Sequence, residues 1–216
     1  MLRRVGRVID DFAGQPPNVG LLKKTRKKKP LLRGIITRIE DQTSLDYPDV
    51  HLYYAMILDA KDSSITRGLI TNERVENKDT VRQVVYLSAF TLDYLAEKVI
   101  TGVLVEEFLH YVYRMKTVIV TQTLGGRPDK EEMEPIDQWF KDRYFRECFE
   151  LAQEPAAPGE AKPMIHEWSK RKYPVVDHSQ IPSLSGALNF EVPREVFEAL
   201  MKRGRLPEAP ERQSKS

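Results

Sequence analysis

The chain has 216 residues, of which 41% are hydrophobic and 31% are charged, a composition typical of one globular domain with appendages. Its formal net charge is only +2, so it is not a uniformly basic or acidic protein. It contains no run of eighteen apolar residues, and Asp10 and Asp11 interrupt the only segment that begins like a secretion signal. A single cysteine, Cys148, excludes an internal disulfide. We therefore expect a cytoplasmic protein without a membrane span.

The net positive charge is concentrated in residues 1–39, which contain eleven Lys or Arg against two Asp, a net charge of +9, so that the remainder of the chain carries −7. Residues 21–30 predict a phosphate-binding surface for nucleic acid or ribosome, because cations gain free energy by releasing counterions. Phe12 is the only aromatic residue of this basic arm, so any such contact would be independent of base sequence. The alternative is a solvated tail without a partner. The candidate residues are Lys23, Lys24, Arg26, Lys27, Lys28 and Lys29.

Three strands are expected after this arm. Residues 51–59, 65–73 and 81–88 are short, rich in β-branched and aromatic residues, and separated by polar turns. The spacing of apolar residues in 31–41 fits either a strand or a helix, so the sequence does not distinguish the two. His51 stands at the start of the first strand, where a surface or turn histidine is expected.

The longest apolar-periodic segment is 92–115, which predicts a long central helix buried on more than one side. Three short strands followed by one buried helix predict an α+β fold, with a small mixed sheet of about three or four strands packed on that helix. The principal apolar stripe of the predicted helix 92–115 recurs at steps of three and four residues, the period of one helix face. It consists of Leu92, Leu95, Val99, Val103, Glu106, His110 and Tyr113.

Ionisable side chains interrupt this stripe. Glu106 and His110 are four residues apart and therefore point into the same space, with Glu107 one step around the helix. A buried carboxylate beside an imidazole is unfavourable unless the two hydrogen-bond, share a proton or hold a metal. The pair therefore marks a candidate site.

The second half of the chain predicts further helices. Residues 115–135 begin either as a strand or as an extension of the central helix. Pro135 suits the first turn of a further helix, and that helix places Glu147 on an apolar stripe. Trp168 and Tyr173 are expected to anchor a short helical C-terminal module onto the body or onto a partner. The expected divisions are a basic arm (1–30), an α+β domain (31–153), a linker (154–163), the module (164–204) and a disordered tail (205–216).

The segment VLVEEFLHYVY resembles the active-site helix of zincin metallopeptidases, whose H-E-x-x-H motif supplies two zinc-binding histidines and a general-base glutamate. The resemblance places Glu107 at the general-base position and His110 at the second ligand position, with Glu106 replacing the first histidine. The minigluzincins within this family take a third ligand, a glutamate, from the following helix, and Glu147 is the matching position. The resemblance implies a zincin-like fold over roughly residues 50–150.

The replacement of a ligand histidine by Glu106 leaves three functions open. We favour a degenerate zincin-like protein that serves as a binding or structural subunit with a protein partner, has impaired or absent peptidase activity and holds no metal. The second is a metal-dependent peptidase, with zinc held by Glu106, His110 and Glu147 and with Glu107 as general base. The third dispenses with the resemblance and takes the protein as a basic-armed nucleic-acid or ribosome accessory factor.

Overall fold

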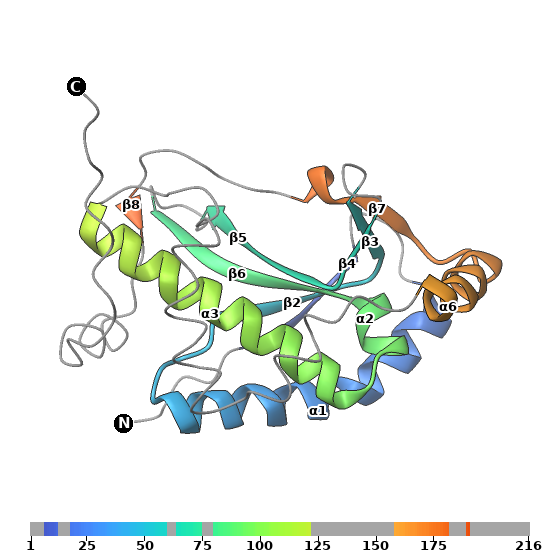
Figure 1. The fold of residues 1–216 in the computed structure, drawn as a ribbon, viewed down its shortest axis with the longest axis horizontal. Coiled ribbons are helices and arrows are strands. Elements are labelled where there is room, and N and C mark those ends of the chain that lie inside the picture. The colour runs from blue at the N-terminus through green and yellow to red at the C-terminus, as the bar shows by residue number, and fades with distance from the viewer. Residues whose placement is uncertain are drawn as a thin grey trace.

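The computed structural model describes residues 7–12, 18–59, 64–74, 80–121, 158–181 and 189–190. Within them the chain folds as the expected α+β class, but with two small mixed sheets instead of one (Figure 1). The larger sheet has the order β1-β2-β6-β5, with β8 (Asn189–Phe190) paired to the start of β6, and the smaller has the order β4-β3-β7. The predicted helix from Pro135, the second part of the C-terminal module and the tail lie outside the described residues.

The strands of the larger sheet are β1 (Val8–Asp11), β2 (Asp49–Tyr53), β5 (Gly68–Arg74) and β6 (Thr80–Ser88). β1 runs parallel to β2 and β2 parallel to β6, whereas β5 is antiparallel to β6 and ends the order on that side. The expected strand at 81–88 is therefore confirmed as β6.

The other two expected strands each divide between the sheets. Residues 51–59 form the end of β2 and then β3 (Met56–Asp59), which pairs with β4 (Ser64–Thr66) and β7 (Val175–Asp177) in the smaller sheet. Residues 65–73 likewise belong to β4 and then β5. The prediction of a single strand over 51–59 was wrong because hydrophobicity continues across the junction: Tyr54 and Ala55 are buried although neither belongs to a strand. At the other junction, the single residue Arg67 separates β4 from β5.

The long helix α1 (Val19–Thr43) begins at Asn18, whose side chain accepts a hydrogen bond from the amide of Leu21. It ends at Ser44, which adopts the left-handed conformation with φ of 58°. Residues 31–41, for which the sequence left strand and helix open, are thus helical. The helix also continues through Pro30, so it crosses the expected boundary between the basic arm and the domain.

The expected helix 92–115 is two helices, α2 (Ala89–Tyr94) and α3 (Glu97–Thr121). Leu95 between them has an extended backbone. Lys28 of α1 donates hydrogen bonds to the carbonyl oxygens of Leu92 and Asp93, and so satisfies acceptors that the end of α2 leaves open. The segment after Met115 extends α3 instead of forming a strand.

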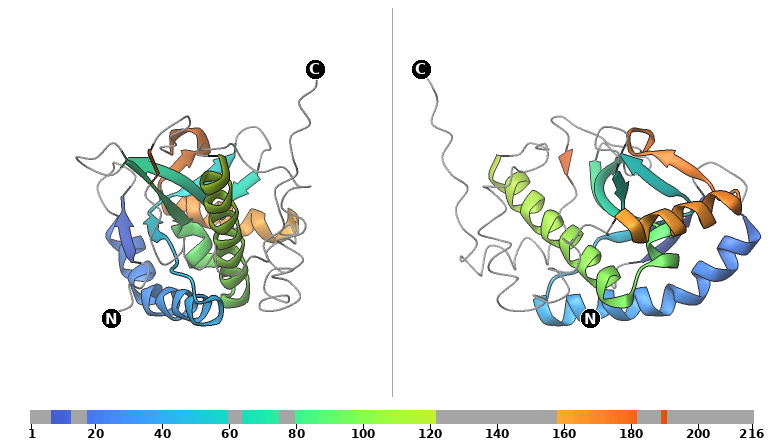
Figure 2. Two further views of the ribbon diagram at one scale, coloured as in Figure 1. Left: turned by 90° about the vertical axis from the view of Figure 1, so that its left-hand side faces the viewer. Right: turned by 45° about the vertical axis from the view of Figure 1, so that its right-hand side comes forward.

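Helices α1 and α3 lie on one side of the larger sheet (Figure 2). Their apolar side chains pack with the β2 and β6 residues that face them, including Val50, Leu52, Val85 and Leu87. Successive strand residues point to opposite faces, so Asp49, His51 and Tyr53 face away from the helices. A second, smaller core on that face joins the two sheets through side chains such as Tyr53, Ile57, Leu69 and Val176.

Helix α6 (Pro158–Lys170) carries Trp168, which is fully buried. The indole lies edge-on to Phe90 of α2 and to Tyr173, with ring centroids 5.4 and 4.9 Å apart, and its Nε1 donates to the carbonyl of Pro174. This confirms the expected anchoring onto the body. The helix begins inside the segment that was expected to be a linker. No helix in the described ranges is both long and apolar enough to cross a bilayer.

Candidate functional site

Helix α3 presents Glu107 on one side and the other two predicted site residues, Glu106 and His110, on another. Glu107 is buried, whereas Glu106 and His110 are only partly buried. A Cβ atom added to Gly68 of β5 would lie 3.4 Å from Cγ of Glu107 and 2.8 Å from Cγ1 of Val103, so Glu107 lies against the end strand of the larger sheet. Glu106 and His110 share a stripe as predicted, but the carboxylate that enters the core is that of Glu107.

Tyr47 and Glu40 complete the surroundings of Glu107. The fully buried Tyr47 hydroxyl donates to the carbonyl of Leu104, 2.7 Å away, and the Tyr47 amide donates to Glu40 Oε1. Burial raises the pKa of Tyr47 well above its usual value, and the negative charges of Glu107 and Glu40 raise it further. Two buried carboxylates therefore lie near one phenol that remains protonated and can donate.

The predicted metal set is not assembled in the described part of the chain. No group of three or more His, Cys, Asp or Glu side chains there is arranged to hold a metal ion. Glu147, the predicted third ligand, lies outside the described residues. Of the predicted ligands, the structure therefore places only Glu106 and His110, one turn apart on α3.

The basic segment is the first half of α1, and four of its six cations contact the body. Lys24 lies 3.0 Å from Asp93, Lys29 lies 2.6 Å from Asp10, and Lys28 binds the α2 carbonyls described above. Lys23, Arg26 and Lys27 are exposed, although Arg26 also lies 3.8 Å from Asp10. Together with the exposed Arg33, these three form the cationic face of α1.

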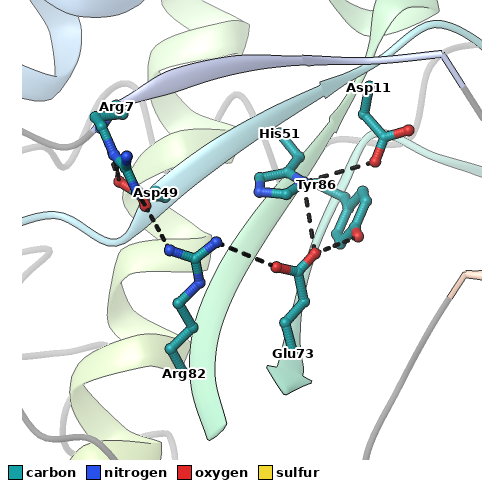
Figure 3. A network of polar contacts seen from close by, with 7 residues as sticks. All are labelled: Arg7, Asp11, Asp49, His51, Glu73, Arg82 and Tyr86. Carbon is teal, nitrogen blue, oxygen red and sulfur yellow. Dashed lines mark hydrogen bonds and ion pairs between the residues drawn. The ribbon is translucent and has the colours of Figure 1, made fainter. Parts of the chain in front are cut away.

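A polar network on the other face of the sheet was not predicted (Figure 3). The carboxylate of Asp49 accepts hydrogen bonds from Arg7 and Arg82 at 2.6 and 3.1 Å, and its side chain is 4% exposed. Arg82 also lies 3.5 Å from Glu73, which accepts a 2.6 Å hydrogen bond from the Tyr86 hydroxyl. Burial raises the pKa of Tyr86, and the bond to Glu73 raises it further.

His51 lies at the centre of this network, between two carboxylates. Its Nδ1 is 3.6 Å from Asp11 Oδ2 and 3.5 Å from Glu73 Oε1, and its ring lies 5.1 Å from that of Tyr86. The side chain is only 12% exposed, so the expectation of a surface or turn histidine was wrong. A sequence signal existed: Asp49, His51 and Tyr53 alternate with the apolar Val50 and Leu52, which predicts a second, polar face.

The chain was compared with protein-family models, with curated proteins and with solved structures, and none of the three comparisons found a match.

Proposed function

We propose that the protein is a binding or structural subunit built on a degenerate zincin-like scaffold, and that α3 retains the remnant of a metal centre. The supporting observation is the division of α3: Glu107 packs into the core against Gly68 and near Tyr47, while Glu106 and His110 lie on a more open stripe. A general base must reach water held by the neighbouring ligands. A carboxylate committed to the core is better suited to a structural role.

The charge of the ligand stripe supports the same proposal. Replacing a neutral imidazole by the carboxylate of Glu106 would offset more of a metal's charge and weaken its action on a bound water. The fold tolerates such a replacement far more easily than catalysis does. Glu106 and His110 are partly exposed, so the proposed contact with a protein partner can include this stripe.

Metal content and a restored ligand test this proposal. Full-length protein purified without chelator should contain far less than one metal ion per chain by elemental analysis and should lack chelator-sensitive hydrolysis of casein. Glu106→His should create zinc binding by restoring the ligand pair with His110. The matched control is Lys170→His, which places a second imidazole one turn from the exposed His166 on α6.

Each contrary outcome has a separate meaning. About one metal per native chain together with chelator-sensitive peptidase activity would replace the proposal by the enzyme alternative, with Glu107 as base. If Glu106→His binds zinc no more tightly than Lys170→His, the zincin ancestry should be abandoned, because any exposed histidine pair would then do as well.

A second candidate, nucleic-acid binding, is favoured by the cationic face of α1. Lys23, Lys27 and Arg33 are held by a rigid helix on one exposed side, a suitable arrangement for contacting a phosphate backbone. Lys24, Lys28 and Lys29 contribute less to this candidate than the sequence predicted, because they contact Asp93, the α2 carbonyls and Asp10.

Charge reversal tests this candidate without shortening α1. Binding of a fluorescent duplex DNA and of a single-stranded RNA of the same length should weaken as the salt concentration rises. The double variant Lys23→Glu with Lys27→Glu should reduce the slope of log K against log salt concentration by an amount equal to about two phosphate contacts. The control is Lys170→Glu with Lys172→Glu, which reverses two exposed charges elsewhere. Equal loss in both variants, or binding insensitive to salt, would dispose of the candidate.

A further inference from the structure

Strand β1 forms the accessible edge of the larger sheet. In the described part of the chain it pairs with β2 and with no other strand, and Figure 2 (left) shows it in blue at the margin of the sheet. The strand at the other end of the order, β5, is enclosed, because residues 69–72 are all buried. Every residue of β1 is only partly buried. Of these two end strands, β1 is therefore the one that another chain can reach.

The backbone of β1 directs hydrogen-bonding groups away from the sheet. The carbonyl oxygens of Arg7 and Asp11 accept hydrogen bonds from amides on β2 and just after it. In a parallel ladder, alternate residues direct their N–H and C=O groups to the same neighbour, so the groups of Val8 and Asp10 face outward. An edge of this kind is a template onto which an extended segment of another chain can add as a further strand.

Cationic side chains stand on both faces of this edge. Arg7 pairs with Asp49 on the face turned away from the helices, and Arg26 of α1 lies 3.8 Å from Asp10 on the helix face. In each pair the acid is the less exposed partner: Arg7 and Arg26 are 58% and 57% exposed, against 4% for Asp49 and 20% for Asp10. The guanidinium groups are thus the charges that an approaching chain meets first, and they favour an acidic one.

We propose that the outer edge of β1 is a docking site for an extended, acidic segment of a partner protein, which adds to the larger sheet as a further strand. Hydrogen bonds to the backbone of Val8 and Asp10 hold the segment, and carboxylates on its two faces pair with Arg7 and Arg26. The site lies at the opposite end of the strand order from β5, against which α3 packs. It is therefore independent of whether α3 binds a metal.

A synthetic peptide and the full-length native protein test the docking by fluorescence anisotropy. The peptide has about eight residues of valine and threonine around two adjacent glutamates, which place one carboxylate on each face of the added strand. We expect saturable binding, and about tenfold weaker binding when lysines replace the glutamates. Methylation of every second peptide nitrogen should abolish binding in one of the two possible sets and be tolerated in the other, because only one set faces β1.

Variants of the protein locate the contact. Val8→Pro removes an outward N–H and keeps the pairing with β2, so it should weaken binding about two- to tenfold. Val8→Ala is the matched control, because it also changes the side chain but keeps the amide. Arg26→Glu should weaken binding of the acidic peptide, whereas Arg33→Glu, at another exposed arginine of α1, should leave it nearly unchanged.

Several results would overturn the proposal. They are the absence of saturable binding up to about 1 mM peptide, equal affinity for the two methylated sets, and equal binding by Val8→Pro and Val8→Ala. A native dimer in light scattering that dissociates in Val8→Pro would assign the edge to a second copy of this chain instead. If Val8→Pro fails to fold, the two methylated peptides still decide with the native protein.

Discussion

Gly68 shows how closely α3 approaches the sheet. A methyl group there would lie 2.8 Å from Cγ1 of Val103, a separation that requires one of the two elements to move. We expect Gly68→Ala to lower the free energy of unfolding by about 1–3 kcal/mol through overpacking. Gly34→Ala is the control, because a Cβ atom at Gly34 in α1 meets nothing within 4 Å and should stabilise by about 0.5–1 kcal/mol. Urea denaturation measures both, and equal effects would show that the close approach is not constraining.

The sequence predicted which side chains of α3 share a stripe, but not which stripe enters the core. The spacing of Glu106 and His110 correctly placed them together, whereas the buried carboxylate is that of Glu107. A helix that is apolar on several sides gives no preference for one of them. His51 was misjudged for a related reason: its burial depends on Asp11 and Glu73, which come from other strands and are distant in sequence.

At the scale of the elements, Trp168 anchors α6 to the body. Trp168 is fully buried among Phe90, Tyr94 and Tyr173. Trp168→Ala should cost about 3–5 kcal/mol of unfolding free energy, because it removes a large buried ring and leaves a cavity. Val175→Ala, at a residue that is 43% exposed, should change stability by less than about 0.5 kcal/mol. If urea denaturation gives the two variants similar stabilities, Trp168 is not the anchor.

The bounds of helices were predicted less well than their existence, and α1 shows why. A proline inside a helix removes a hydrogen bond and costs about 3 kcal/mol, yet α1 runs through Pro30 and across the boundary that was expected after residue 30. The helix continues because Leu21, Leu32, Ile35, Ile36 and Ile39 are buried on both sides of Pro30, which is itself exposed. Conversely, the apolar pattern continues across the break between α2 and α3. Lys28 donates there to the carbonyl oxygens of Leu92 and Asp93, which in an unbroken helix would accept backbone hydrogen bonds.

For the molecule as a whole, acid should weaken the attachment of β1 to α1. Burial alone would raise the pKa of Asp10, but hydrogen bonds from Lys29 and Tyr54, together with the charges of Lys29 and Arg26, lower it overall. A lowered folded-state pKa gives stability that is present above the unfolded value of about 3.9 and is lost as pH falls through the folded value. Asp10→Asn should therefore destabilise at pH 7, and the difference from the native protein should shrink as pH falls from about 3.9 toward pH 3.

Urea denaturation at the two pH values measures this difference. Asp41→Asn, at an exposed carboxylate near the end of α1, provides the comparison at the same two pH values. A constant difference between native protein and Asp10→Asn from pH 7 to pH 3 would show that the carboxylate contributes nothing through its charge.

The α+β class followed from composition and order of elements, but the division into two sheets did not, because hydrophobic strands are alike whichever sheet they join. The link between β2 and β3 gives that division a mechanical meaning. Tyr54 donates its amide to Asp11, Met56 donates to Pro174, and the carbonyl of Ala55 accepts from the Ser88 hydroxyl. These hydrogen bonds join both sheets at one buried corner, so we expect the two sheets to unfold together as a single cooperative unit.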